Sequence, residues 1–148
     1  ERLGKIKKSD EDLLLSLKIL PDNSNILNYL AYSWLERDIN ISKSVSMLEL
    51  AYEKDDKSPY VTDSIGWAYY LTNRFEEAEV LLRKAIILMP NDPIVNDHYG
   101  DILWKLNRKI QAKYFWNNVL KLKDVDNETR IRIKAKLLKG PKKINESL

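Results

Sequence analysis

The stretch that decides the fold is PYVTDSIGWAYYLTNRFEEAEVLLRKAIILMPND, residues 59–92, because the residues that follow repeat its pattern. Residues 93–126, PIVNDHYGDILWKLNRKIQAKYFWNNVLKLKDVD, align with it without a gap. The matching pairs are Pro59 with Pro93, Asp63 with Asp97, Gly66 with Gly100, Asn73 with Asn107, and Ala78 with Ala112. The period is 34 residues, and periods of roughly 20–50 residues indicate a repeat architecture.

The same frame extends backward over residues 24–58, with one extra residue. The extra residue falls in the polar segment 36–42, where a turn tolerates insertions. Farther back, Pro21 takes the place that Pro90 has in the later unit. Residues 1–23 therefore match the second half of a unit whose first half is missing, and we expect the chain to be a piece of a longer protein.

Each unit is predicted to contain two helices joined by a short turn. The first stripe of apolar residues at helical spacing in the middle unit is Val61, Ile65, Ala68 and Tyr69, and the second is Ala78, Leu81, Leu82, Ala85 and Ile86. Asn73 breaks the pattern between the stripes, and Pro90 ends the second helix. Gly66 lies in mid-helix, where glycine costs about 1 kcal/mol relative to alanine. We therefore expect a second helix to approach closely at this glycine.

These residues resemble the tetratricopeptide (TPR) repeat, whose pattern is W-x2-L-G-x2-Y, A-x3-F and P. The middle unit supplies Ile65-Gly66-x2-Tyr69, Ala78-x3-Leu82 and Pro90, with Thr62 in place of the tryptophan. The third unit supplies Tyr99-Gly100, Leu103, Ala112 and Trp116. The resemblance covers residues 1–126 and is strongest to the C-terminal repeats of longer bacterial TPR proteins. It implies an all-α solenoid of helix-turn-helix units, wound as a right-handed superhelix with a C-terminal capping helix.

The predicted organisation is the second half of a truncated unit (1–23), three repeats (24–58, 59–92 and 93–126), a capping helix (127–140) and a disordered tail (141–148). In the capping helix Ile131, Ala135 and Leu138 have helical spacing and are predicted to form the stripe that packs on the preceding repeat. We expect its lysines and arginines to form the polar outer face that the end of a solenoid requires.

The resemblance implies that the first helix of each unit lines a concave groove with the face opposite its packing stripe. The residues predicted there are Asn25, Asn28, Tyr32, Tyr60, Asp63, Trp67, Tyr70, Asp97, His98, Asp101 and Trp104. Trp67 and Trp104 are the leading binding candidates, because a helix buried on one side has no packing reason to carry tryptophan on the other. Tyr70 fits packing between repeats equally well.

Three other aromatic residues fall on packing stripes and are predicted to be core: Trp34, Tyr69 and Trp116.

Some TPR domains hold a partner's terminal carboxylate with Lys, Arg and Asn in the groove. Here acidic residues and His98 stand at those places, which argues against such a clamp. A basic, aromatic or amphipathic segment of a partner protein fits better.

The sequence carries no pattern of a catalytic or cofactor site. Cysteine is absent and the one histidine, His98, has only Asp97 and Asp101 near it, too few ligands for a structural metal. Gly-rich phosphate loops and a nucleophile with a base are also absent. We therefore predict a non-catalytic protein-interaction scaffold without cofactor or metal.

Two alternatives remain open. A structural or assembly module would work by stacking, with self-association through the apolar edge of Leu13, Leu14 and Leu17. A nucleic acid or an anionic membrane would instead bind the basic residues of 128–148, although the net charge of the chain is only +3. The compartment is also open: the cytoplasm is the default, and a signal segment in the full-length chain would change it to the periplasm or a membrane.

Overall fold

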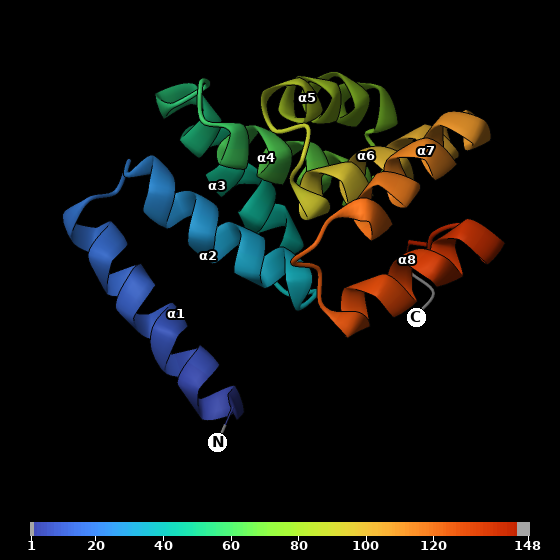
Figure 1. The fold of residues 1–148 in the computed structure, drawn as a ribbon. Helices are drawn as coiled ribbons and strands as arrows, with labels where there is room; N and C mark the ends of the chain where they lie inside the picture. The colour runs from blue at the N-terminus through green and yellow to red at the C-terminus, as the bar shows by residue number, and fades with distance from the viewer. Residues whose placement is uncertain (1, 145–148) are drawn as a thin grey trace. The chain divides into compact units, whose positions relative to one another are not determined.

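The computed structural model describes residues 2–144, and within them the chain forms eight α-helices and no strand (Figure 1). The helices are α1 (Arg2–Ile19), α2 (Ser24–Glu36), α3 (Ile41–Lys54), α4 (Pro59–Leu71), α5 (Phe75–Leu88), α6 (Pro93–Lys105), α7 (Lys109–Lys121) and α8 (Asn127–Lys139). The predicted all-α class is confirmed. Residues 145–148 of the predicted tail lie outside the described residues. No helix of 2–144 is long and apolar enough to cross a membrane.

A capping residue precedes α2, α4, α6 and α8 at an almost constant interval. The side chains of Asn23, Ser58, Asp92 and Asp126 each accept a hydrogen bond from the backbone N–H three residues later, at 3.0, 3.3, 3.0 and 2.7 Å. Each bond satisfies one of the N–H groups that the start of a helix leaves without a partner. The caps are 35, 34 and 34 residues apart, so α8 begins in the same frame as the first helices of the three repeats.

The turn inside each repeat depends on one residue in the left-handed conformation. These residues are Asp38, Asn73 and Asn107, with φ of 55°, 62° and 61°. Asn and Asp adopt this conformation more readily than most residues. The N–H of the next residue then donates to a carbonyl five residues earlier, in Ile39 to Trp34, Arg74 to Tyr69 and Arg108 to Leu103. In the first turn Asn40 is also left-handed, which accommodates the extra residue.

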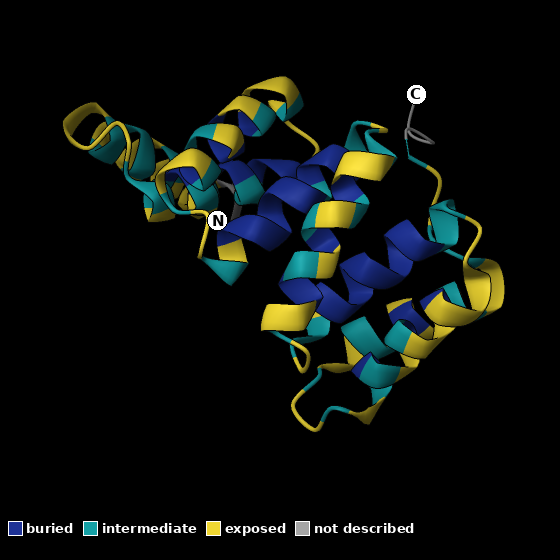
Figure 2. Cartoon of the chain, turned by 90° about the horizontal axis from the view of Figure 1, so that it is seen from above, coloured by how far each residue is buried: buried dark blue, intermediate teal, exposed yellow. Residues whose placement is uncertain are grey.

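The chain divides into two compact units between Ala68 and Tyr69, within α4. In the N-terminal unit α1 contacts α2 and α2 contacts α3. In the C-terminal unit α5 contacts α6, α6 contacts α7, and α7 contacts α8. Most helices are buried along one side and exposed along the other, as the dark blue and yellow ribbons of Figure 2 show. These helices therefore bury their apolar stripes against their neighbours in sequence.

A polar contact joins α1 to α2. The carboxylate of Asp10 accepts hydrogen bonds from the indole Nε1 of Trp34 at 3.0 Å and from the guanidinium of Arg37 at 2.7 and 2.8 Å. Trp34 is buried, as predicted. The apolar edge expected on α1 differs in detail. Leu13, Leu14 and Leu17 are half-buried, and the exposed apolar residues near the end of α1 are Leu15, Ile19 and Leu20.

Trp116 is the largest fully buried side chain in the described residues. A Cβ atom built on Gly100 would lie 2.5 Å from its Cδ1 atom and 2.9 Å from its Cε2 atom, well inside van der Waals contact. At Gly100, the counterpart of Gly66, the close approach is therefore made by an indole side chain and not by the backbone of a second helix. The core positions predicted for Trp116 and Tyr69 are confirmed, because both are buried.

We predict that Gly100→Ala destabilises the chain, although alanine is the better helix former. The added methyl group collides with the buried indole of Trp116, and overpacking of this kind costs about 1–3 kcal/mol. The free energy of unfolding in urea, followed by far-UV circular dichroism, measures the effect. The matched control is Gly4→Ala, because a Cβ there meets nothing within 4 Å. A Gly100→Ala variant as stable as the parent would contradict the prediction.

Candidate functional site

Helix α6 carries four polar side chains inside the protein: Asn96, Asp97, His98 and Asp101. All residues from Val95 to Leu103 are buried, and Asp97 and Asp101 are only 5% and 2% exposed. His98 is buried as well. These three residues were predicted to face a groove, and the structure places them under other side chains. Among the described residues no group of three or more His, Cys, Asp or Glu side chains is placed to hold a metal ion.

Helix α8 supplies the cations that these carboxylates need. Lys136 Nζ lies 2.7 Å from Asp97 Oδ1 and 2.9 Å from both carboxylate oxygens of Asp101. Arg132 Nη2 donates to Asp97 Oδ2 at 3.2 Å, but its side chain is half exposed. Asp101 also accepts a bond from Trp116 Nε1 at 3.2 Å. We call Asp97 and Asp101 the acidic pair. The cations that bind this pair therefore come from the chain itself and not from a basic segment of a partner.

Burial controls the ionisation of this cluster. It raises the pKa of the Asp101 carboxyl from 3.8 to about 6, against the attraction of Lys136, which lowers it. For Lys136, burial alone would lower the pKa, but the attraction of Asp101 and Asp97 outweighs it and the pKa is raised. Burial, followed by the charges of Asp101 and Asp97, also raises the pKa of the Tyr70 phenol. Tyr70 is therefore part of the interior beside the acidic pair.

The packing stripe predicted for α8 is wrong. Ile131 and Leu138 are 70% and 83% exposed, and Ala135 is exposed too. The inward side instead carries Ile133, which is fully buried, and Lys136. The buried carboxylates of α6 pair with basic side chains of α8, so this side of α8 faces inward in place of the predicted apolar stripe. The reason is that an unpaired buried charge costs far more free energy than an exposed leucine.

Arg130 completes this inward side. Its guanidinium donates to the carbonyl oxygens of Leu120 and Leu122 at 2.8 and 2.7 Å, where α7 ends. The last carbonyls of a helix have no partner within the helix, so a cation at this point satisfies them and complements the helix dipole. The prediction that the lysines and arginines of α8 form its outer face thus fails for Arg130 and Lys136.

The three exposed apolar residues occupy the positions of a groove face. Ile131, Ala135 and Leu138 follow Asp97, Asp101 and Trp104 by one period of 34 residues. We call them the α8 apolar face. Sequence reasoning missed them as candidate binding residues, although the cap at Asp126 carried the signal: it keeps the frame of Asp92, so that α8 has the phase of a first helix.

Trp104 is half-buried and takes part in packing α8. Its ring centroid lies 5.5 Å from that of Trp116, and Lys109 Nζ lies 4.8 Å from its centre. Gly140, which ends α8 with φ of 77°, also lies against the indole, because a Cβ there would be 2.6–2.7 Å from the ring atoms. Only glycine fits both this conformation and this contact.

The remaining predicted residues belong to the N-terminal unit, and we call them the N-terminal face: Asn25, Asn28, Tyr32, Tyr60, Asp63 and Trp67. Asn25 is exposed and Tyr60 is 64% exposed. Asn28, Tyr32 and Trp67 are half-buried, and Asp63 is buried. Asn28 Oδ1 is shielded from solvent and accepts no hydrogen bond from any described residue.

Comparison with known proteins identifies the fold. No family model matches the chain. The TPR repeat-containing protein PA4667 of Pseudomonas aeruginosa is 28% identical over 101 residues, which are 68% of this chain and 17% of that protein. The thermophilic TPR protein TTC0263 of Thermus thermophilus has a similar structure, with a TM-score of 0.73, 19% identity, and 93% of this chain and 75% of that chain covered.

The chain has the tetratricopeptide-repeat fold. A further structure with this fold is the first TPR of Spaghetti (RPAP3) bound to the HSP90 peptide SRMEEVD, with a TM-score of 0.63 and 16% identity over 76% of this chain and 89% of that one. The TPR fold generally serves as a scaffold for interactions between proteins. Since this chain spans 17% of the length of PA4667, the comparison bears on one part of such a protein.

We predict that Lys136→Met destabilises the TPR unit by about 3–5 kcal/mol, the usual cost of removing one partner of a buried ion pair. Urea unfolding measures the loss, and amide hydrogen exchange locates it, with faster exchange expected in α8. Lys139→Met is the control, because Lys139 is exposed on the same helix and its loss should cost less than about 0.5 kcal/mol. Equal stability of the two variants would refute the structural role of Lys136.

We predict that acidification stabilises the parent relative to an Asp101→Asn variant. The pKa of Asp101 is about 6 in the folded state, above its ordinary 3.8, so the folded state binds this proton more tightly. The free energy of unfolding of the parent minus that of the variant should therefore rise as the pH falls from about 6.5 to about 4.5. Urea titrations at several pH values test the slope. A difference that falls over this range would contradict the raised pKa.

Proposed function

We propose that this chain is a non-catalytic interaction module that holds an amphipathic segment of a partner protein on the outward faces of its first helices. The TPR fold supports the general role, and the structure of RPAP3 with an HSP90 peptide gives one case in which this fold binds a peptide. The observation that carries the proposal is the α8 apolar face: apolar side chains exposed at the positions where a TPR unit faces its groove.

The α8 apolar face favours an apolar contact over a basic one in the C-terminal unit. Ile131 and Leu138 lie two helical turns apart and are both largely exposed. The acidic pair is already paired with Lys136 and Arg132, so a basic ligand would have to displace a cation of the chain itself. An apolar stripe on a partner helix would instead bury about the area of two large side chains, worth roughly 1.5–3 kcal/mol each.

The N-terminal face supports recognition by aromatic and polar groups within its own unit. Tyr60 presents a large amphipathic ring to solvent, and tyrosine is enriched at the energetic centres of protein interfaces. Asn25, which is exposed on α2, adds a polar side chain that a ligand can reach. Trp67, half-buried on α4, is the third anchor that we assign to this face.

Self-association is a second candidate, favoured by the exposed Leu15, Ile19 and Leu20 on α1 and just after it. Burial of this patch against a second copy would make the sedimentation coefficient depend on concentration. A coefficient that stays constant up to high concentration would exclude this candidate.

The basic residues of α8 give little support to binding of nucleic acid or a membrane. Lys136 and Arg130 bond within the protein, and Arg132 pairs with Asp97. The cations left for an external anion are therefore fewer than the sequence indicates, and we do not propose this function.

We predict that Leu138→Asp weakens the binding of peptides to the α8 apolar face, and that Tyr60→Ala weakens the binding of peptides to the N-terminal face. Each loss should be about tenfold or more, as expected when one large side chain no longer contributes. Peptides selected from a random displayed library on the purified chain provide the ligand, and fluorescence anisotropy gives its affinity. Amphipathic peptides with apolar residues at helical spacing should dominate the selection.

Ile110→Asp is the matched control, because Ile110 is 88% exposed on α7 and lies on neither proposed face. This variant should bind the selected peptides as the parent does. The proposal is wrong if Leu138→Asp and Tyr60→Ala leave the affinity unchanged, or if the Ile110→Asp variant loses it equally.

A further inference from the structure

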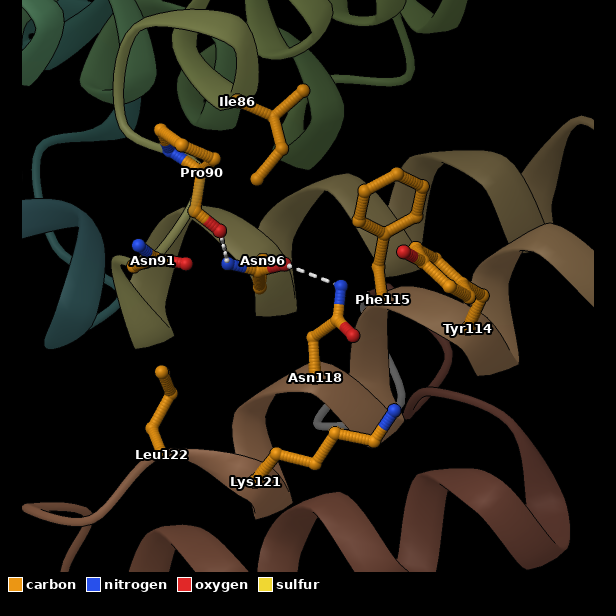
Figure 3. Close-up of a pocket in the computed structure, with 9 residues that line it drawn as sticks. All are labelled: Ile86, Pro90, Asn91, Asn96, Tyr114, Phe115, Asn118, Lys121 and Leu122. Atoms are coloured by element: carbon orange, nitrogen blue, oxygen red, sulfur yellow. Dashed lines mark hydrogen bonds between the residues drawn. The ribbon is translucent and has the colours of Figure 1, made fainter.

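A pocket of about 510 Å³ opens in the C-terminal unit between the end of α5, the turn into α6, and the last two turns of α7 (Figure 3). We call it the α5–α7 pocket. This volume lies within the range of about 300–1,000 Å³ usual for ligand sites. Neither the acidic pair nor the α8 apolar face lines it. A ligand bound here would therefore use a surface separate from the one proposed above.

A chain of hydrogen bonds fixes which atoms face the pocket. The buried side chain of Asn96 donates through Nδ2 to the carbonyl oxygens of Pro90 and Asp92, at 2.9 and 2.8 Å. Its Oδ1 atom is then left to accept, and Asn118 Nδ2 approaches it at 3.5 Å. This order orients the Asn118 amide so that its Oδ1 atom accepts no hydrogen bond from the described residues. Figure 3 shows the two amides linked end to end.

Aromatic contacts hold the ring at the apolar part of the pocket. The ring of Phe115 packs edge-on against Tyr99, with centroids 4.7 Å apart, and against Tyr114 at 5.2 Å. Ile86 from α5 and Leu122 from the end of α7 complete the apolar lining, and Figure 3 shows them on either side of the amide pair. Side chains held by such contacts lose little freedom when a ligand binds. The site is therefore suited to one large apolar side chain.

The charge of the lining favours a ligand with a negative charge. Lys121 is the only charged side chain of the lining, and no carboxylate accompanies it. Lys121 is exposed and forms no ion pair with a described residue. Helix α7 as a whole carries Lys109, Lys113 and Lys121 and no acidic residue. A carboxylate beside the apolar group of the ligand would therefore be attracted to this surface.

We propose that the α5–α7 pocket binds an acidic peptide segment of a partner protein. A large apolar side chain of the segment fills the space between Ile86, Phe115 and Leu122. A neighbouring Asp or Glu side chain pairs with Lys121, and a backbone N–H of the segment donates to Asn118 Oδ1. The pocket thus gives the chain a second, acid-selective recognition site.

Blocked tetrapeptides test the proposal by NMR on the 15N-labelled full chain. The probe is acetyl-Ser-Phe-Glu-Ser-amide, titrated to millimolar concentration. The side-chain amide signals of Asn96 and Asn118 should shift, together with backbone signals of the last turns of α7. Replacing Phe by Ala in the peptide should weaken binding by about tenfold, and replacing Glu by Gln by about three- to fivefold.

Variants and a second peptide separate the alternatives. Lys121→Gln should reproduce the loss seen with the Gln peptide, whereas Lys113→Gln, an exposed lysine of α7 outside the lining, should not. The peptide Ser-Phe-Ser with a free terminal carboxylate should bind more weakly than the Glu peptide. The proposal is overturned if the pocket signals do not shift, if all peptides shift them equally, or if Lys121→Gln has no effect. Loss of library-peptide binding in the Leu138→Asp variant leaves this result unaffected, so the two sites are tested independently.

Discussion

Two carboxylates buried on one helix require a cation, and the end of the chain is arranged around that requirement. Asp97 and Asp101 are one turn apart on α6 and almost closed to solvent, so leaving them unpaired would cost several kcal/mol. Lys136 satisfies both at once, and its position determines which side of α8 faces inward. Because Lys136 and Ile133 occupy that side, Ile131 and Leu138 are directed to solvent. A requirement of the interior has in this way produced an exposed apolar surface.

The periodic features of the fold could be predicted from the sequence, because each has a local cause. The turn residues Asn73 and Asn107 repeat since the left-handed position accepts few other side chains. Gly100 repeats Gly66 and leaves room for the indole of Trp116. The orientation of α8 could not be predicted in the same way. Its apolar stripe satisfies the usual rule for a packed helix, and only the contact between Lys136 and residues 35 and 39 positions earlier in the chain reverses it. Nonlocal electrostatics leave no periodic signal.

The candidate binding residues also divide into those predictable from local sequence and those that depend on distant contacts. Exposed positions such as Tyr60 and Asn25 followed from helix phase alone, because nothing distant covers them. Asp97 and Asp101 share the phase but bond to Lys136 of α8, His98 is buried, and Trp104 lies against Gly140. The α5–α7 pocket had no sequence signal, since its amide pair joins Asn96 to Asn118 across two helices whose spacing the sequence does not state. Phase thus predicts which side of a helix a residue occupies, and only the structure shows what lies against it.

The packing of Trp104 also has an optical consequence. Its indole lies 5.5 Å from that of Trp116, tilted by 35°, close enough for the two chromophores to couple electronically. Trp116 donates to the carboxylate that Lys136 neutralises, and Trp104 supports the glycine at which α8 ends. Both rings therefore lie close to groups at the C-terminal end of α8. The chain contains a built-in near-ultraviolet reporter of α8 docking, which can be read without any label.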